Sequence, residues 1–261
     1  SRERAGWLCD SYFSAKAEQL FTGENKVEEA FLQNYAMSPH LSYIPDKMIP
    51  MCYPADFVNA QYIPNWAMWY VVELYDQYLR SGDFSVAEAS REKVYGILSF
   101  FEKYRNEYGL LENLESWVFV EWSMANDEEF IKGINFPSNM LYAKAVESAG
   151  LLYSDGALLE KAEKVRSAVR EYSFDGEFFE DNRVRCEGGT KLLGHITETC
   201  QYYAFFSGVA TPQTYPKLFE LLTEKFGATR DVRMTYPKVY KSNAFIGNYL
   251  RLMMLARSDK R

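Results

Sequence analysis

Histidine and closely spaced cysteine are scarce in this sequence of 261 residues. It has only two histidines, His40 and His195, and none of its four cysteines lies in a C-x-x-C pair. A structural zinc site needs four such ligands at short spacings, so this composition disfavours one. We expect no metal and no cofactor, with a bound calcium ion as the alternative. The cysteines are interpreted as unpaired small apolar residues, with a single disulfide as the alternative.

Basic runs and long apolar runs are also missing. No run of Lys and Arg exceeds two residues, and the net charge is -7. A nucleic-acid partner would need a basic patch, and a membrane span would need about 18 uninterrupted apolar residues. We therefore expect neither partner. The chain opens without Met or a signal peptide, so we place residue 1 inside a longer protein. Its localisation stays open between bacterial cytoplasm and periplasm or secretion.

Aromatic side chains are abundant, at 16% of the sequence, with 20 Tyr and 18 Phe. This content suits a thick helical core, where most of these rings are expected. It also suits a sugar-binding cleft, because flat rings stack on flat sugar faces.

A repeated helix pair dominates the chain. In each pair the first helix is apolar nearly all round, and the second carries its charges on one face. The pairs are expected at about 11–37, 66–104, 140–172 and 198–226, with a further first helix from 244. Small polar residues that could cap the first helices precede or open them: Asn65, Ser138, Thr197 and Ser242.

Alternating buried and amphipathic helices build an α/α toroid or an α-solenoid. Long connections at 38–63 and 109–135 favour the toroid, because function usually lies in such loops, and residues 174–185 are interpreted as a small β-hairpin insertion. A ring of six hairpins needs twelve helices, whereas about nine are recognisable. We therefore predict an all-α (α/α)6 toroid, incomplete in this chain. Residues 1–261 would be the N-terminal part of a catalytic domain in a larger multidomain protein.

The first ten residues, SRERAGWLCD, gather acids beside an aromatic ring. Glycoside hydrolysis needs one carboxylic acid to protonate the leaving oxygen and a second carboxylate on the opposite face of the sugar. A neighbouring aromatic residue and a second acid raise the pKa of the first acid. Glu3, near Trp7 and Asp10, fits that chemistry. The alternative is a capping acid and surface charges in a loop.

The same segment resembles the signature of the family 78 α-L-rhamnosidases, D-C-P-(x)-R-E-R-x-G-W-x-G-D. The match covers Arg2, Glu3, Arg4, Gly6, Trp7 and Asp10, while Cys9 replaces the usual Gly. The resemblance implies that Glu3 is the general acid and that Arg2 supports it. It also implies that Asp10 binds sugar hydroxyls and that Trp7 helps to wall the pocket for the rhamnose methyl group.

Two further segments continue the resemblance. IPNWAMW (63–69) corresponds to a helix start over the sugar site, which makes Trp66 a candidate, although Trp66 and Trp69 could equally be a core pair. SWVFVEWSMAND (116–127) corresponds to another aromatic subsite, which makes Trp117, Glu121 and Trp122 candidates.

The family's catalytic base, a Glu that follows a Trp, has no counterpart here, because the sequence contains no Trp-Glu pair. We expect that segment after residue 261, so that this chain alone would be inactive. Glu198 could be mistaken for the base, but an acid at a helix opening favours capping and the helix dipole. Glu121 and Asp127 are the other acids near the expected cleft.

The sequence thus predicts an inverting glycosidase that removes terminal α-L-rhamnose from a rhamnoside or from a plant or microbial polysaccharide fragment. Its remaining partners would be other domains of the same polypeptide. The alternatives are another α/α-toroid glycosidase, either a glucosidase or a uronyl hydrolase, and a non-catalytic helical-repeat binding module.

Overall fold

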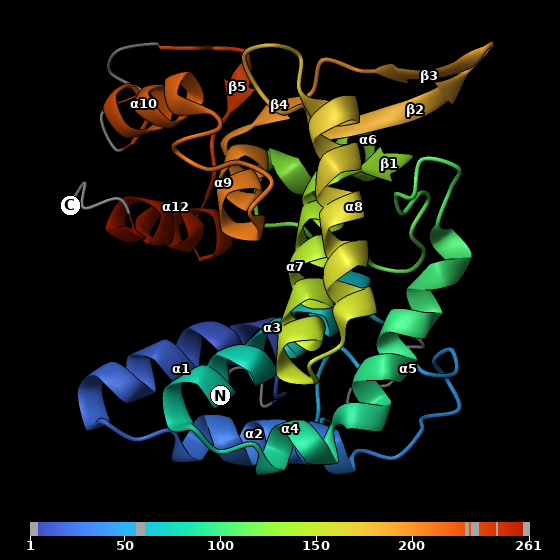
Figure 1. Ribbon diagram of the computed structural model, residues 1–261, viewed down its shortest axis with the longest axis vertical. Helices are drawn as coiled ribbons and strands as arrows, with labels where there is room; N and C mark the ends of the chain where they lie inside the picture. Colours follow the sequence, from blue (N-terminus) through green and yellow to red (C-terminus); the bar gives the residue numbers. More distant parts are fainter. Residues whose placement is uncertain (1–4, 56–60, 228–229, 231–234, 244, 258–261) are drawn as a thin grey trace. The chain divides into compact units, whose positions relative to one another are not determined.

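The computed structural model describes residues 5–55, 61–227, 230, 235–243 and 245–257. They form two compact units, and helices α7 (Phe136–Leu152) and α8 (Gly156–Ser173) contribute residues to both. Figure 1 shows that helices dominate, with a few short strands. None of the described helices is long and apolar enough to cross a membrane.

The first unit contains two of the predicted helix pairs. The first pair is α1 (Leu8–Thr22) and α2 (Lys26–Met37), and the second pair begins with α3 (Pro64–Ser81). Helix α3 contacts α1 and α2, as Figure 1 shows in the blue to teal part of the ribbon. Pro64 to Leu74 are all buried, which confirms the predicted enclosure for the first three turns, whereas Leu79 in the last turn is 61% exposed.

The second helix of that pair is divided. The predicted continuous helix is instead α4 (Ser85–Ala89), α5 (Arg91–Phe101) and a 3-10 turn, η1 (Glu102–Tyr104). The break falls at Ser90, which is fully buried and hydrogen-bonded to the Tyr70 hydroxyl of α3 at 2.8 Å. A polar side chain that must meet a partner in the core thus fixes where the outer helix bends.

The second unit combines helices with two small sheets. After η2 (Met124–Asn126) and α6 (Glu128–Ile131), strand β1 (Ile134–Asn135) leads into α7. Helix α9 (Glu198–Ser207) is buried throughout and contacts α12 (Ile246–Arg257), whereas α10 (Pro216–Glu224) is amphipathic. The predicted division into enclosed first helices and amphipathic second helices is confirmed here too.

The predicted hairpin exists, but it lies further along the chain. Its strands are β2 (Asn182–Cys186) and β3 (Gly189–Leu192), with β1 paired to the other edge of β2. Residues 174–181, the first part of the predicted hairpin, instead make a tight loop closed by a Phe174–Phe179 bridge. A second sheet pairs β4 (Ile196–Thr197) with β5 (Val239–Tyr240) in parallel.

The predicted capping residues have mixed outcomes. Thr197 caps α9 by accepting a hydrogen bond from the Cys200 amide at 3.0 Å, as predicted. Asn65 lies inside α3, after Pro64, and Ser138 lies inside α7, so both predictions are wrong. Asn135 supplies the oxygen that Ser138 was expected to give, since its Oδ1 accepts from the Ser138 amide. Ser242 precedes α12 and instead lies near Glu198.

Asp181 joins three parts of the second unit and should make its stability depend on pH. Its backbone bonds Phe136 and His195, and its carboxyl accepts from the amide and hydroxyl of Thr197, both at 2.7 Å. Complete burial raises the pKa of Asp181 to about 8, against the lowering effect of the Thr197 hydrogen bonds.

A carboxyl whose pKa is higher in the folded state than in the unfolded chain stabilises the fold most at low pH. That stabilisation is lost as the pH rises from about 4 toward the folded pKa. We expect Asp181→Asn, which imitates the protonated acid, to reduce the loss of unfolding free energy over this range by roughly 2–4 kcal/mol. Urea unfolding followed by circular dichroism at several pH values measures it. Parallel curves for the two proteins would contradict a protonated Asp181.

Candidate active site

The acidic motif enters the first unit as an extended segment. Ser1 to Arg4, and with them the predicted acid Glu3 and its neighbour Arg2, lie outside the described residues. From Gly6 the chain pairs antiparallel with residues 51–54, through bonds from Leu8 N to Met51 O and from Tyr53 N to Gly6 O. A side chain at position 6 would place its Cβ only 2.6 Å from Tyr53 O, so this close approach requires glycine.

Asp10 and Trp7 line one pocket of about 310 Å³ in this unit. Asp10 is exposed in the first turn of α1, where the positive end of the helix dipole stabilises its carboxylate. Trp7 directly precedes α1 and is partly buried. Ser11, Ser14 and Phe31 complete much of the wall. The pocket is large enough for one sugar ring and combines an acid, hydroxyls and aromatic faces.

A row of aromatic rings extends from this pocket. The Trp7 and Trp66 rings meet edge to face with centroids 5.3 Å apart, and Trp66 meets Phe119 at 5.7 Å. The Trp117 ring also meets Phe119, with centroids 5.8 Å apart. Successive ring contacts thus connect Trp7, Trp66 and Trp117 through Phe119. The sequence analysis did not identify Phe119, although it stands two residues after Trp117.

Trp66 and Trp69 are both buried, as their interpretation as core residues expects, and they pack against different rings. Trp69 is fully buried against Tyr12 and Phe13 of α1. Trp66 is 6% exposed, and its indole Nε1 has no hydrogen-bond acceptor among the described residues. A buried N–H without an acceptor is rare in native proteins and is expected where a ligand or water supplies one.

The loop that carries Trp117 is fastened to the start of α3. The Trp117 amide donates to Tyr62 O at 3.2 Å, and the Tyr62 amide donates to the Ser116 hydroxyl at 3.0 Å. Asn65 accepts from the Phe119 amide at 3.1 Å. Asn65 therefore positions this loop rather than capping the helix.

Glu121 and Trp122 belong to the second unit. Glu121 is fully buried, and its oxygens accept from the Thr199 hydroxyl at 2.5 Å and from the Gly247 amide at 2.6 Å. Burial raises the pKa of Glu121, while these donors lower it. A Cβ at position 247 would lie 2.2 Å from Glu121 Oε1 and 2.6 Å from Ser242 Cβ, so a larger residue would displace these side chains. The carboxyl oxygens of Glu121 are thus engaged by protein donors, which hold the loop that carries Glu121 to α9 and α12.

Trp122, by contrast, is 63% exposed, with its backbone oxygen bonded by Asn243 Nδ2 at 2.6 Å. Such an accessible indole offers a face on which a sugar can stack.

The other acids considered as a base have structural partners. Glu198 is buried in an ion pair with Arg230 and also accepts from the Tyr202 hydroxyl. Glu198 lies in the first turn of α9, where an acid favours the helix dipole, as predicted. It does not cap the helix, because Thr197 does. Asp127 caps α6 by accepting from the Glu129 amide. None of these three acids stands as an uncommitted base.

Metal-binding groups do not gather in the part of the chain that the structure describes: no three His, Cys, Asp or Glu side chains there could hold an ion. All four cysteines are free thiols, as predicted, and Cys9, Cys52 and Cys200 are buried.

The comparisons with known proteins agree with one another. A family model described as the bacterial alpha-L-rhamnosidase 6 hairpin glycosidase domain matches residues 1–181. The GH78 family rhamnosidase of Bacillus sp. GL1 is similar in structure with a TM-score of 0.80 at 17% identity, and the match covers 100% of this chain and 26% of that chain. The rhamnosidase from Klebsiella oxytoca, solved with rhamnose bound, gives 0.75 at 14% identity, covering 100% of this chain and 47% of that one.

At 17% and 14% identity, the structural similarity shows a shared fold and no more. The chain spans well under two thirds of either rhamnosidase. No curated protein matches this sequence.

Proposed function

Because the chain belongs to the bacterial α-L-rhamnosidase six-hairpin glycosidase family, whose fold is an α/α toroid, we propose that it removes terminal α-L-rhamnose by an inverting mechanism. The observation that carries the proposal is the pocket of the first unit, where Asp10 and Trp7 stand together. Beside Trp7, the buried Trp66 offers an N–H that lacks an acceptor among the described residues.

Catalysis needs an acid, a base and a water. Glu3 donates a proton to the glycosidic oxygen, with Arg2 supporting it. A second carboxylate activates water on the opposite face of the ring, about 6.5–9.5 Å from the first, so that the anomeric centre inverts. The buried Glu121 and Glu198 and the capping Asp127 are committed elsewhere, so we assign the base to a segment beyond residues 1–261. Other domains of the polypeptide would complete the enzyme.

The pocket residues supply binding and orientation. Asp10 accepts hydrogen bonds from sugar hydroxyls, and these bonds strengthen as the ring flattens toward the oxocarbenium state. Trp7 walls the side that receives the methyl group, and Trp66 donates its indole N–H. Trp117, which is linked to Trp66 through Phe119, is assigned to the outer part of the substrate. Trp122 is proposed as a separate stacking face on the second unit, and Glu121 is left out of the site because its oxygens are engaged by protein donors. The substrate class is a rhamnoside or a plant or microbial polysaccharide fragment.

A panel of glycosides tests the proposal directly. The complete protein should hydrolyse an α-L-rhamnoside and release the β-anomer first, which NMR of the early product detects. Matched α-glucoside and unsaturated uronyl substrates should react at least about 10²-fold more slowly, because a site that hydrogen-bonds particular hydroxyls rejects analogues that misplace them. Preferred cleavage of either analogue would transfer the assignment to that sugar. No cleavage of any glycoside would leave a binding module.

A further inference from the structure

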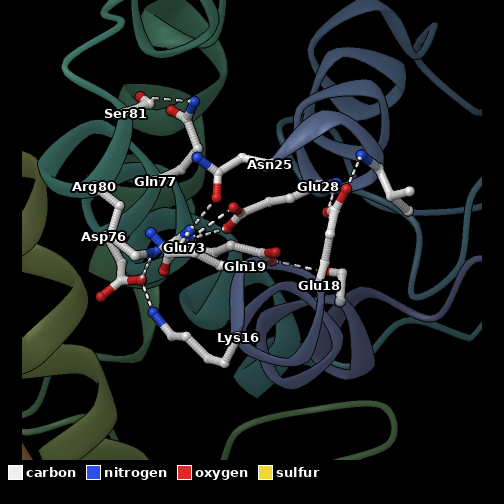
Figure 2. A network of polar contacts seen from close by, with 12 residues as sticks. Lys16, Glu18, Gln19, Asn25, Glu28, Glu73, Asp76, Gln77, Arg80 and Ser81 are labelled. Carbon is white, nitrogen blue, oxygen red and sulfur yellow. Dashed lines mark hydrogen bonds and ion pairs between the residues drawn. The ribbon is translucent and has the colours of Figure 1, made fainter. Parts of the chain in front are cut away.

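Glu73 is a buried acid of α3 that the proposed mechanism does not use. Its side chain is fully buried, one oxygen lies 2.6 Å from the Ser11 hydroxyl of α1, and the other has no hydrogen-bond partner among the described residues. Figure 2 shows Glu73 behind a polar network in which Arg80 holds both oxygens of Glu28. Glu28 is thus paired with a cation, whereas Glu73 meets a neutral hydroxyl.

The two contacts of Ser11 bear on which partner carries the proton. The Ser11 hydroxyl lies 2.7 Å from Leu8 O and 2.6 Å from Glu73 Oε2, and both are good hydrogen-bond lengths. A hydroxyl has a single proton, and a backbone carbonyl can only accept. If Glu73 is protonated, the Ser11 proton can go to Leu8 O while Glu73 donates to the Ser11 oxygen. A protonated Glu73 satisfies both contacts at once.

The surroundings of Glu73 favour the same state. Burial raises its pKa well above the ordinary range, and the charge of Glu28 from α2 raises it further. A Ser11 hydroxyl that donates to the ionised acid, Lys16 of α1 and Arg80 of α3 would each lower it but do not outweigh burial. The other titratable groups that sense this acid are Cys9, Tyr35 and Tyr70, each neutral with a raised pKa.

Ser11 connects this acid to the pocket. It lines the pocket beside Asp10 and belongs to the first turn of α1, which follows Trp7 directly. The side chain of Trp7, at the N-cap position, makes no capping hydrogen bond to this turn. The contact between Glu73 of α3 and Ser11 reaches this turn from the buried side of α1.

We propose that Glu73 is a positioning residue of the sugar pocket, a neutral carboxylic acid that donates a hydrogen bond to Ser11 and so fixes the turn that bears Trp7 and Asp10. The proposal rests on the proposed function in one respect, namely that Trp7 and Asp10 meet the sugar.

Three variants of the complete protein test it by their KM and kcat on a rhamnoside. Glu73→Gln keeps a neutral donor of the same shape and should stay within about twofold of wild type. Glu73→Leu and Ser11→Ala each remove the bond and should raise KM about tenfold, with a smaller change in kcat. The double variant should be no worse than Glu73→Leu, because both changes delete one interaction. Gln77→Leu is the matched control, since Gln77 is also buried one turn further along α3 and its amide donates to the Ser81 hydroxyl of the same helix rather than to α1.

The pH profile separates positioning from a merely structural role. Wild type should lose affinity as the pH is raised and Glu73 begins to ionise, whereas Glu73→Gln should keep its KM. Additive effects in the double variant, a Gln variant as impaired as Leu, or identical pH profiles would overturn the proposal.

Hydrogen exchange distinguishes this failure from a failure of the proposed function. The amides of residues 8–12 should exchange faster in Glu73→Leu and Ser11→Ala than in Glu73→Gln, whatever the substrate. If wild type neither binds nor cleaves a rhamnoside, the proposed function falls, and this exchange pattern still decides whether Glu73 fixes the turn. Unchanged exchange in all three variants would refute the positioning role by itself.

Discussion

Replacing Glu3 with Gln in the complete protein should lower kcat on an unactivated α-L-rhamnoside by about 10²–10⁴-fold. The amide keeps the size of the side chain but cannot transfer a proton to the departing oxygen. KM should change little, because the proton moves only in the transition state and the ground-state contacts remain. Initial rates at saturating and limiting substrate separate the two constants.

The leaving group offers a sharper form of the same experiment. An aryl rhamnoside with a good leaving group, such as 4-nitrophenolate, departs with little protonation. Glu3→Gln should therefore lose far less activity on the aryl substrate than on an alkyl or sugar rhamnoside. Glu24→Gln is a suitable control, because Glu24 is an exposed acid that pairs with Lys26 on the surface. Near-normal hydrolysis of the unactivated rhamnoside by Glu3→Gln would refute Glu3 as the acid.

The helices were predictable because burial on all sides leaves a strong pattern. Most positions in α9 and in the first three turns of α3 are apolar or small, and such segments must lie inside. The amphipathic partners follow from their charges. The same logic could not locate the division of the outer helix at Ser90, because the Tyr70 hydroxyl that fixes it comes from another helix.

Polar residues at helix starts were harder to interpret. Asn65, Ser138 and Thr197 all have side chains suited to capping, yet only Thr197 caps its helix. Asn65 serves a loop 54 residues away along the chain. Local sequence shows which groups can form a hydrogen bond, whereas tertiary contacts decide which partner each one meets.

The candidate site shows the same limit. The motif pointed to Trp7 and Asp10, which the structure places in one pocket, and to Trp66, which meets Trp7. It gave no sign of Glu73, because an acid within an apolar helix acquires its role from a serine 62 residues away. A buried acid amid apolar neighbours was nevertheless a visible anomaly, since such residues are almost never buried without a partner.

Arg230→Met should destabilise the second unit by about 3–5 kcal/mol, because it leaves Glu198 as a buried charge without its cation. Glu198 and Arg230 are both nearly buried, at 6% and 5% exposure. The guanidinium also donates to Thr235 O and Tyr236 O at 3.0 and 2.8 Å and lies over the Phe226 ring. Urea unfolding followed by circular dichroism measures the loss.

A double-mutant cycle isolates the pair from the rest of the guanidinium's bonds. Glu198→Gln with Arg230→Met removes both charges, so it should be less destabilised than the sum of the single changes by at least about 1 kcal/mol. Arg230→Lys should not restore wild-type stability, since an ammonium cannot reach the acid and the backbone oxygens together. The same cycle bears on catalysis. If Glu198 belongs to this pair, Glu198→Gln in the complete protein should lower stability and leave kcat within about tenfold. A loss of kcat comparable to that of Glu3→Gln, with stability unchanged, would instead make Glu198 the base.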